Sequence, residues 1–445
     1  MPWLYSALLA FTLFLLLPYW LWQMARSGKY RAGLSERFGR VPARLRPTAA
    51  GENCIWIHAV SVGEVLAIAG LVEGLRKRFP GWRVVVSTTT LAGQALARKS
   101  FGEGDVFYLP LDLPFALRRY LRHLSPRMLV LAETEFWPNL LFETKRQGAR
   151  IAVVNARISD RSLPRYRYFR RLLREPLAQV NLFLAQSAQD KARLLAIGAA
   201  AERTQVSGNL KFDISAAKES ALVAELRAAV TSGAPVLVCG STVAGEEEIL
   251  IAAFQAIQRD YPAAVMVLAP RHPERFDAVA ELLSASAISF RRRSRWLKDP
   301  IPGGVFLLDT IGELAALYAL ADVAFVGGSL APRGGHNILE PARFGKAIVV
   351  GPHTENFRDI ITLFARVQAL CQLTEAQINE AELSATLLQL FHDPGRRAAL
   401  GAAAEKVFRE NAGATARTLD ALEVLVWMPG NLPVAATQPR GEARR

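Results

Sequence analysis

The chain alternates short apolar runs with longer segments of helical pattern along most of its 445 residues. The runs have strand length and are apolar throughout, which is typical of strands buried on both faces of a parallel sheet. They read CIWIHAV, WRVVVST, DVFYLP, MLVLAE, RIAVVNA and NLFLAQS, and later PVLVCGS, AVMVLAP, GVFLLD, VAFVGG and AIVVGP. Helical patterns lie between them, for example over residues 64–79, 114–123 and 138–146. The alternation predicts an α/β protein and excludes an all-α or all-β fold.

A pause in this alternation divides the chain into two halves. Residues 211–220 form a polar stretch, and the rhythm of strands and helices resumes after it. Since 445 residues exceed one ordinary hydrophobic core, we predict two doubly wound domains, over residues 53–215 and 216–427. The segment 428–445 is rich in Pro, Gly and Arg and is predicted to be a disordered tail. Ligands are expected in the cleft between the halves, where strand ends point.

The amino end carries no charged side chain from Met1 to Ala25. A bilayer core is spanned by about 20 apolar residues, so residues 1–25 are predicted to be a membrane anchor, followed by a basic connector over residues 26–52. Aromatic residues near both ends of the apolar run fit the membrane interface, and the cations after it place the rest of the chain in the cytoplasm. Pro18 leaves open an interfacial helix instead of a span.

The formal net charge of +14 predicts an anionic neighbour. Two segments, residues 165–176 and 291–298, interleave arginine with aromatic and aliphatic residues. After a membrane anchor, these segments are interpreted as surfaces for anionic headgroups or a phosphorylated lipid, with RNA binding or solvated helix faces as the alternatives. The three cysteines, Cys54, Cys239 and Cys371, lack metal-ligand spacing and are predicted to be reduced.

A glycine-rich turn follows the apolar run Asp322–Val326. It reads GGSLAPRGGHNILEPA, with a helix expected to begin near His336 and Asn337 and with Glu340 about one turn into it. Glycines allow the backbone to approach a ligand, and the N–H groups of a helix start attract an anion. A carboxylate such as Glu340 can accept hydrogen bonds from a ribose. The turn predicts a nucleotide or nucleotide-sugar site, and a purely structural turn is the alternative.

Three loops of the first half place charged side chains after strand-like runs. HAVSVGE ends with Glu64, which at a helix start can take a proton from a hydroxyl nucleophile. AETEFWPN carries Glu133 and Glu135, and because an extended segment alternates its side chains, we expect at most one of them to face the cleft. NLKFD supplies Lys211, a cation suited to a phosphate or a carboxylate. A first-turn glutamate and a solvated lysine are the ordinary alternatives.

Two loops of the second half complete the set. In APRHPERF, Arg271 and His272 can clamp a phosphate, and in LLDTIGEL a helix is expected to open between Thr310 and Glu313. The chain has no Walker phosphate loop, no G-x-G-x-x-G fingerprint, no Asp-x-Asp pair and no histidine cluster. The sequence therefore predicts chemistry without a metal ion or a cofactor, in which cations and helix ends stabilise charge.

Taken in order, these loops resemble those of the 3-deoxy-D-manno-octulosonic acid (Kdo) transferases of lipopolysaccharide synthesis. The resemblance runs from the anchor to about residue 425 and rests on HAVSVGE, ETEFWPN, NARIS, GNLKFDIS, PRHPERF, DTIGEL, FVGGSL, RGGHNILEPA and GPHTENF. It implies a GT-B architecture of two Rossmann-like domains. It also implies an inverting glycosyltransferase that moves Kdo from CMP-Kdo to a phosphorylated lipid A precursor, lipid IVA. The reaction would take place at the cytoplasmic face of the inner membrane, without a nucleic-acid partner.

The resemblance also implies roles for particular residues. Glu64 would be the general base for the acceptor hydroxyl, and Glu133 and Lys211 would support the transition state. One departure is visible, because GSTVAGEEE has Val243 where the family usually has histidine, which weakens any donor contact assigned to that loop. The positions that match the CMP-binding segments are Pro270, Arg271, Ile311, Gly312, Glu313, Asn337, Ile338, Leu339 and Glu340.

Two alternatives remain open at this point. One is another GT-B glycosyltransferase, or an epimerase, that uses a different nucleotide sugar; turnover with UDP- or ADP-sugars alone would favour it. The other is a non-catalytic membrane scaffold or an RNA-binding protein, as the net charge allows. That alternative predicts that the substitution Glu64→Ala leaves function intact.

Overall fold

The computed structural model describes residues 2–27, 32–213 and 220–428. The chain divides into two compact units, the first made of Met1–Asp213 with Ala412–Arg445 and the second of Ile214–Asn411. Each unit is built around a seven-stranded sheet whose paired strands are all parallel. The predicted α/β class with two parallel sheets is confirmed.

The sheet of the first unit has the strand order β3-β2-β1-β4-β5-β6-β7. Its strands β1, β2 and β4 are buried along their whole length, as the continuously apolar runs predict for a parallel sheet covered on both faces. The order reverses between β1 and β4, so the carboxyl ends of these two strands form a topological switch point. The strands are β1 (Cys54–His58), β2 (Arg83–Thr88), β3 (Val106–Tyr108), β4 (Met128–Ala132), β5 (Arg150–Ala156), β6 (Leu182–Ala185) and β7 (Thr204–Val206).

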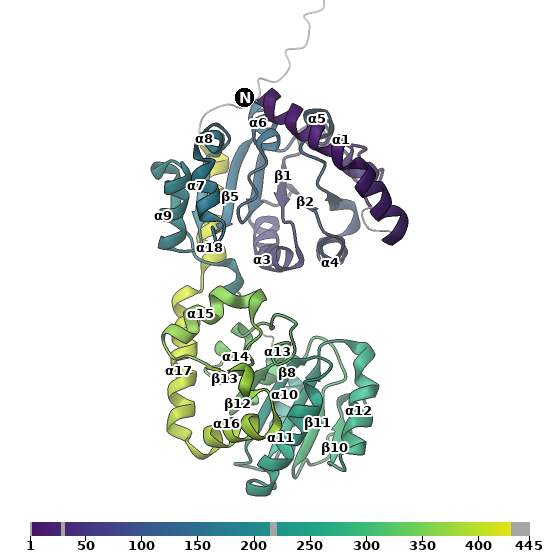
Figure 1. Ribbon diagram of the computed structural model, residues 1–445, viewed down its shortest axis with the longest axis vertical. Helices are drawn as coiled ribbons and strands as arrows, with labels where there is room; N and C mark the ends of the chain where they lie inside the picture. The colour runs from purple at the N-terminus through teal and green to yellow at the C-terminus, as the bar shows by residue number, and fades with distance from the viewer. Residues whose placement is uncertain (1, 28–31, 214–219, 429–445) are drawn as a thin grey trace, which may run out of the picture. The chain divides into compact units, whose positions relative to one another are not determined.

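Helices cover both faces of this sheet (Figure 1). One core lies under α3, α4 and α18, and the other lies under α5, α6, α8 and α9. The helices are α1 (Pro2–Ser27), α2 (Leu34–Arg37), α3 (Val62–Arg78), α4 (Leu91–Phe101), α5 (Pro114–Leu124), α6 (Pro138–Arg146), α7 (Leu163–Tyr168), α8 (Arg170–Ala178), α9 (Ala188–Ile197) and α18 (Ala414–Trp427).

The last helix, α18, belongs to the first unit, where Figure 1 shows it in yellow among the blue elements. Its apolar side chains Leu419 and Leu422 lie in the same core as Ile68 of α3. Asp213 fixes its start, because one carboxylate oxygen accepts a hydrogen bond from Gly413 N at 2.6 Å. The prediction that residues 412–427 close the second domain is therefore wrong. A helical pattern at a chain end does not reveal which core it covers.

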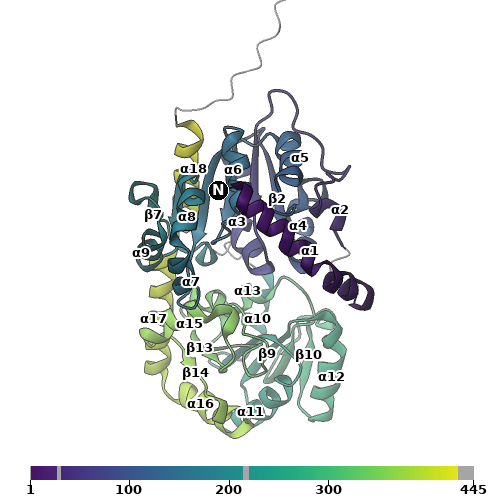
Figure 2. The ribbon, with the colours of Figure 1, turned by 45° about the horizontal axis from the view of Figure 1, so that its top comes forward.

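Helix α1 lies beside α6, as Figure 2 shows, and Ser6 Oγ donates a hydrogen bond to Asn139 Oδ1 at 3.1 Å. Other side chains of α1 stay exposed, including Trp3 at 74% and Phe14 at 71%. Among the residues that the structure describes, no helix combines the length and the apolarity that a bilayer crossing requires. The predicted tail lies outside the described residues from 429 onward.

The sheet of the second unit has the order β10-β11-β9-β8-β12-β13-β14, with its switch point between β8 and β12. Its helices pack on both faces, α11, α12 and α16 over one core and α10 and α13 over the other. The strands are β8 (Val236–Thr242), β9 (Val265–Pro270), β10 (Phe290–Arg292), β11 (Gly304–Leu307), β12 (Val323–Val326), β13 (Ala347–Val350) and β14 (Cys371–Gln372). The helices are α10 (Ala221–Ala229), α11 (Glu247–Asp260), α12 (Phe276–Ala285), α13 (Leu314–Leu317), α14 (Leu339–Ala342), α15 (Arg358–Arg366), α16 (Glu380–His392) and α17 (Pro394–Asn411).

Candidate active site

The predicted catalytic residues of the first unit gather at its switch point. Glu64 follows β1 and Glu133 follows β4, and these strands are neighbours in the sheet. Lys211 lies on the short 3-10 turn Leu210–Phe212, which follows β7, and its Nζ is 3.7 Å from Glu133 Oε1. The tertiary structure therefore brings together three charged groups that are far apart in sequence.

Glu64 is held in one orientation by the start of α3. Ser61 is the N-cap residue, and Glu64 stands at the third helical position. The Glu64 carboxylate accepts a hydrogen bond from Val60 N at 2.8 Å and another from Ser61 Oγ at 3.0 Å. Its side chain is largely buried, since the residue is 8% exposed. The two hydrogen bonds and the burial therefore fix the orientation of the Glu64 carboxylate.

The electrostatic setting of Glu64 suits a base near neutral pH. Burial, together with the negative charges of Glu133 and Glu135, raises the pKa of the Glu64 carboxyl to about 7, although the bonds from Val60 N and Ser61 Oγ oppose this shift. A carboxyl that titrates near the working pH can both take and release a proton efficiently. Glu64 therefore has the proton affinity that the sequence-based role requires.

Glu133 occupies a strained backbone conformation, with φ at 57°. A non-glycine residue in the left-handed region costs free energy, and such strain is concentrated at functional sites. The same turn removes the premise that Glu133 and Glu135 alternate on an extended segment. Both carboxylates contribute to raising the pKa of Glu64, and the expectation that at most one of them faces the site stays a prediction. Glu135 is anchored by Trp137 Nε1, which donates to its carboxylate at 2.9 Å.

Two asparagine side chains hold the loop that carries Lys211. Asn209 Oδ1 accepts a hydrogen bond from Lys211 N at 3.0 Å, and Asn155 Oδ1 accepts one from Leu210 N at 3.0 Å. Asn155, at the end of β5, also has a positive φ of 53°. The NARIS segment thus positions the lysine loop, a role that its sequence did not announce.

The predicted nucleotide segments of the second unit also lie at strand ends. Pro270 closes β9 and Arg271 follows it, with Arg271 N donating to Thr242 O at the end of β8 at 2.8 Å. The Arg271 charge acts on the pKa of Glu340, which follows β12, so these two segments are close in space. Burial raises the pKa of Glu340, against the influence of Asn337 and Arg271.

The segment after β12 is fixed by its own side chains. Asn337 Oδ1 accepts from Leu339 N at 3.1 Å, and Asn337 Nδ2 donates to Glu340 Oε1 at 3.3 Å. Helix α14 begins only at Leu339, slightly later than predicted, and it is four residues long. Ile338 and Leu339 are buried, so this segment can present Asn337 and Glu340 rather than its apolar side chains.

The segment after β11 presents an exposed apolar side chain next to an open turn. Ile311 is 75% exposed, and Gly312 has φ at 92° with nothing within 4 Å of the place a Cβ would take. Glu313 is already partnered, because it accepts from Arg293 at 3.0 Å and from the Thr310 hydroxyl. Ile311 and Gly312 are thus the accessible part of this segment.

The backbone of the glycine-rich turn does not offer its first N–H groups to a ligand. The Glu246 carboxylate, fully buried, accepts hydrogen bonds from Gly328 N, Ser329 N and Leu330 N, each at 2.8 Å. It also accepts from Val243 N at 3.0 Å. An internal carboxylate therefore occupies the N–H groups at these positions, which leaves the later part of the segment, from His336 onward, as the part predicted to meet an anion.

Sequence reasoning missed Glu246. The run GEEE follows β8, but nothing in the letters tells which of its acids turns inward. Glu246 binds the turn after β12, and the buried Glu247 pairs with Arg275 at 3.0 Å, whereas Glu248 is exposed. A buried carboxylate at a switch point has no direct signal in a single sequence.

The arginines of the two basic segments, residues 291–298 and 165–176, differ in how many are held in ion pairs. In the segment 291–298, Arg292 binds Asp309 at 2.8 Å and Asp277 at 2.7 Å, and Arg293 binds Glu313. Arg292 and Arg293 therefore brace the unit, whereas Arg291 and Arg295 of the same segment are exposed, and the interpretation of this segment as a headgroup surface stays a prediction. In the segment 165–176, by contrast, the arginines are exposed beside Tyr168, which is 83% exposed.

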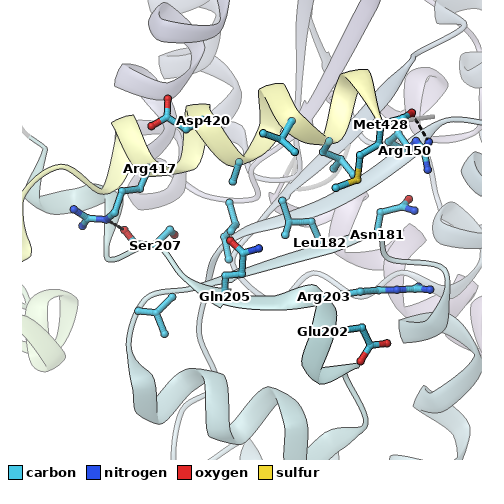
Figure 3. Close-up of a pocket in the computed structure, with 15 residues that line it drawn as sticks. Arg150, Asn181, Leu182, Glu202, Arg203, Gln205, Ser207, Arg417, Asp420 and Met428 are labelled. Atoms are coloured by element: carbon cyan, nitrogen blue, oxygen red, sulfur yellow. Dashed lines mark hydrogen bonds between the residues drawn. The ribbon is translucent and has the colours of Figure 1, made fainter. Parts of the chain in front are cut away.

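A separate hollow of about 600 Å³ lies between α18 and the edge strand β7 in the first unit (Figure 3). Its arginines bond to backbone carbonyls: Arg417 to Ser207 O at 2.8 Å and Arg150 to Met428 O at 2.9 Å. None of the predicted site residues lines it. These bonds fasten α18 to the sheet, so the hollow is interpreted as a structural seam.

Comparisons with known proteins show the family of this chain. Residues 32–214 match the family model described as 3-deoxy-D-manno-octulosonic-acid transferase (kdotransferase). The chain is 35% identical over 403 residues to the 3-deoxy-D-manno-octulosonic acid transferase of Haemophilus influenzae, which covers 89% of this chain and 92% of the relative. It is 39% identical over 417 residues to the enzyme of the same name from Bordetella pertussis, with 91% and 95% covered.

A solved structure supports the architecture. The UDP-GlcNAc 2-epimerase from Neisseria meningitidis, bound to UDP-GlcNAc, is similar with a TM-score of 0.51 and 13% identity, covering 83% of this chain and 99% of that chain. At this identity the likeness concerns the fold alone. It agrees with the expected GT-B type of two parallel-sheet α/β domains.

Proposed function

The chain belongs to the 3-deoxy-D-manno-octulosonic acid (Kdo) transferases, and from this premise we propose that it moves Kdo from CMP-Kdo to lipid IVA, a phosphorylated lipid A precursor. It is thus a glycosyltransferase of lipopolysaccharide biosynthesis. The identity of the acceptor and the roles of the individual residues are parts of the proposal.

The observation that carries the proposed mechanism is the setting of Glu64. Its carboxylate is fixed by two hydrogen bonds, is 8% exposed and has a pKa raised to about 7 by burial and by its acidic neighbours. A hydroxyl nucleophile needs a base of this kind, because its own pKa is far above neutral. We assign Glu64 as the general base.

The proposed reaction forms one bond to the anomeric carbon of Kdo and breaks another. The acceptor hydroxyl gives its proton to Glu64, and its oxygen forms a bond to the anomeric carbon of Kdo. The bond from that carbon to the phosphate oxygen of CMP breaks on the opposite face, with inversion, and the electron pair leaves with CMP. Negative charge therefore decreases at Glu64 and grows on the departing monophosphate.

The ion pair of Lys211 and Glu133 supplies a second part of the mechanism. Lys211 Nζ is 3.7 Å from Glu133 Oε1, and both side chains are about a quarter exposed, at 23% and 24%. A lysine in this setting can still turn toward an incoming anion, while Glu133 keeps it at the site. We propose that Lys211 stabilises negative charge in the transition state.

The second unit supplies the proposed nucleotide contacts. Arg271 stands next to the Asn337–Glu340 segment, as its effect on the pKa of Glu340 indicates. Arginine matches the bidentate geometry of phosphate, and the carboxylate of Glu340 can accept hydrogen bonds from ribose hydroxyls. Ile311 and Gly312 provide exposed backbone and an apolar side chain for the remaining part of CMP.

The proposal includes attachment to the cytoplasmic face of the inner membrane. Helix α1 leaves Trp3, Leu8 and Phe14 exposed at 74%, 64% and 71%. Arg26 follows in its last turn, and the exposed arginines of α7 and α8 belong to the same unit. Exposed apolar side chains next to cations are typical of surfaces that lie against anionic lipids. A membrane-bound enzyme would meet its lipid acceptor there.

The proposal is tested by product analysis. Full-length protein is incubated with lipid IVA and with CMP-Kdo that a CMP-Kdo synthetase generates continuously, and the lipid is analysed by mass spectrometry. We expect a lipid heavier by one or more Kdo residues, with one CMP released for each Kdo transferred. Turnover with UDP- or ADP-sugars alone would instead favour another nucleotide-sugar enzyme and contradict the proposal.

A further inference from the structure

A basic hollow of about 470 Å³ opens at the switch point of the second unit. It is lined by residues of three loops, each of which follows a strand that ends at this edge of the sheet. They are Val243 and Ala244 after β8, His272 and Arg275 after β9, and Arg333 and His336 after β12. The hollow is therefore close to the proposed CMP-binding segments, because Arg271 and Asn337 are each adjacent in sequence to a lining residue.

The charge of this lining is positive and incompletely balanced. Arg275 pairs with Glu247 at 3.0 Å. His272 approaches Glu274, the one acidic residue of the lining, at 3.8 Å, but both side chains are more than half exposed, at 58% and 76%. Arg333 is exposed, and no carboxylate among the described residues forms an ion pair with it. The hollow thus has at least one cation available for an anionic ligand.

Two ring or guanidinium nitrogens of the lining are buried without a hydrogen-bond partner. They are Arg275 Nε and His336 Nε2. An unpaired buried donor or acceptor costs free energy, so such atoms point to a ligand group or a solvent molecule that completes them. His336 is held in place, because its ring packs against Gly328, where an added Cβ would come within 2.7 Å of it.

The field inside the hollow repels positive charge. Burial, together with the positive charges of Arg271 and His272, lowers the pKa of His336 to about 4. The same field would stabilise a negative group placed beside His336. The apolar wall of Val243, which is 7% exposed, reduces competition from water on one side.

We propose that this hollow, through Arg333, Arg275 and His336, binds the carboxylate of the sugar in the donor CMP-Kdo. The inference rests on the proposed function and adds a specificity site to it. In an activated ulosonic acid the carboxylate and the phosphate are attached to the same carbon. A protein that holds CMP on Arg271 and on the Asn337–Glu340 segment therefore needs a second cationic place directly beside them.

This arrangement discriminates between sugars. An aldose nucleotide has hydrogen where Kdo has its carboxylate, so it would leave Arg333 and His336 without their partner and would gain nothing from them. Charge-assisted contacts to a carboxylate are among the stronger polar contacts in proteins. The hollow would thus select the donor by the group that distinguishes it from the common nucleotide sugars.

The test compares two ligands that differ by the sugar. The KM for CMP-Kdo is measured with continuous donor regeneration, and the dissociation constant of CMP is measured by calorimetry, both on the full-length protein. For Arg333→Ala we expect the KM for CMP-Kdo to rise about tenfold, or ~1.4 kcal/mol, with the affinity for CMP unchanged. Arg333→Lys should restore part of the loss, because it keeps the charge.

Two further variants make the result decisive. Arg259→Ala, an exposed arginine near the opposite end of α11, should change neither value. His336→Asn should also raise the KM for CMP-Kdo more than it weakens CMP. If Arg333→Ala weakens CMP as much as CMP-Kdo, the hollow holds the phosphate and the carboxylate assignment is wrong. If the wild type is active and Arg333→Ala leaves both the KM for CMP-Kdo and the dissociation constant of CMP unchanged, the proposed carboxylate site is wrong but the proposed function stands. A wild type that does not use CMP-Kdo would overturn the proposed function.

Discussion

Lys211 Nζ lies 3.7 Å from Glu133 Oε1, across a turn in which Glu133 has a positive φ. The separation is longer than a good hydrogen bond, so the pair is a loose contact rather than a locked one. Lys211 can therefore turn toward an anionic ligand, and the Glu133 carboxylate that it leaves is still partly exposed to solvent. This relationship, together with Glu64 on the neighbouring strand end, sets the catalytic predictions.

The substitution Glu64→Gln should remove transfer while preserving nucleotide binding. The amide has nearly the same shape but cannot accept the proton of the acceptor hydroxyl, and general-base catalysis typically contributes about 10²–10⁴ in rate. We expect kcat to fall by this factor. The CMP dissociation constant should stay at the wild-type value, because the proposed CMP segments belong to the second unit. Transfer at the wild-type rate would exclude Glu64 as the base.

The activity should depend on pH through Glu64. The base acts as the carboxylate, and burial raises its pKa to about 7, so kcat/KM should be lost as the pH falls through about 7 and should be fully present well above it. In Glu133→Gln, one negative neighbour of Glu64 is removed, so the pKa of Glu64 falls and this acid limb should move to lower pH. A limb that stays in place in the variant would show that another group titrates.

The substitution Lys211→Met should lower the rate of the chemical step more than it weakens substrate binding. The methionine keeps much of the volume but removes the charge that we propose to act on the transition state. Losing one such electrostatic contact typically costs about 10²–10³ in kcat. Single-turnover kinetics would report the loss directly, with Lys191→Met, at a half-buried lysine of α9, as the control variant. A change confined to KM would contradict the assignment.

Glu246 should prove essential for the fold of the second unit's switch point. In Glu246→Gln the amide nitrogen would face Val243 N and Gly328 N, so two buried donors lose their acceptor, each at a cost of about 1–3 kcal/mol. We expect a lower free energy of unfolding and weaker CMP binding. Denaturant titration measures the first and calorimetry the second. Glu248→Gln, on the exposed neighbour, should leave both unchanged, and equal behaviour of the two variants would remove Glu246 from this role.

Helix α1 should determine attachment to lipid. The double substitution of Leu8 and Phe14 by serine removes exposed apolar side chains without touching the contact of Ser6 with α6. Each large apolar side chain contributes about 1.5–3 kcal/mol on leaving water, so binding to vesicles with anionic phospholipids should fall steeply. Co-sedimentation measures this, with Val424→Ser as the control, since Val424 is an apolar residue of α18 that is 58% exposed. Undiminished sedimentation would contradict the membrane proposal.

The sequence alone determined the architecture and the identity of most candidate residues. Continuously apolar strand-length runs such as CIWIHAV are typical of strands buried on both faces, and their alternation with helical patterns favoured a parallel sheet covered by helices. Charged residues directly after such runs must meet at one edge of the sheet. Glu64, Glu133 and Lys211 could therefore be selected in advance, as could the segments at Arg271 and Asn337.

Only the tertiary structure decided how those residues are held. Three features depend on contacts between segments far apart in the chain. Helix α18 completes the first core, Glu246 accepts hydrogen bonds from the glycine-rich turn, and Arg292 forms ion pairs with Asp277 and Asp309. A helical pattern or a run of acids has the same letters whether it faces solvent or a buried N–H group. Burial and pairing arise from the packing of distant strands, and these decide which charge is structural and which is free to act on a substrate.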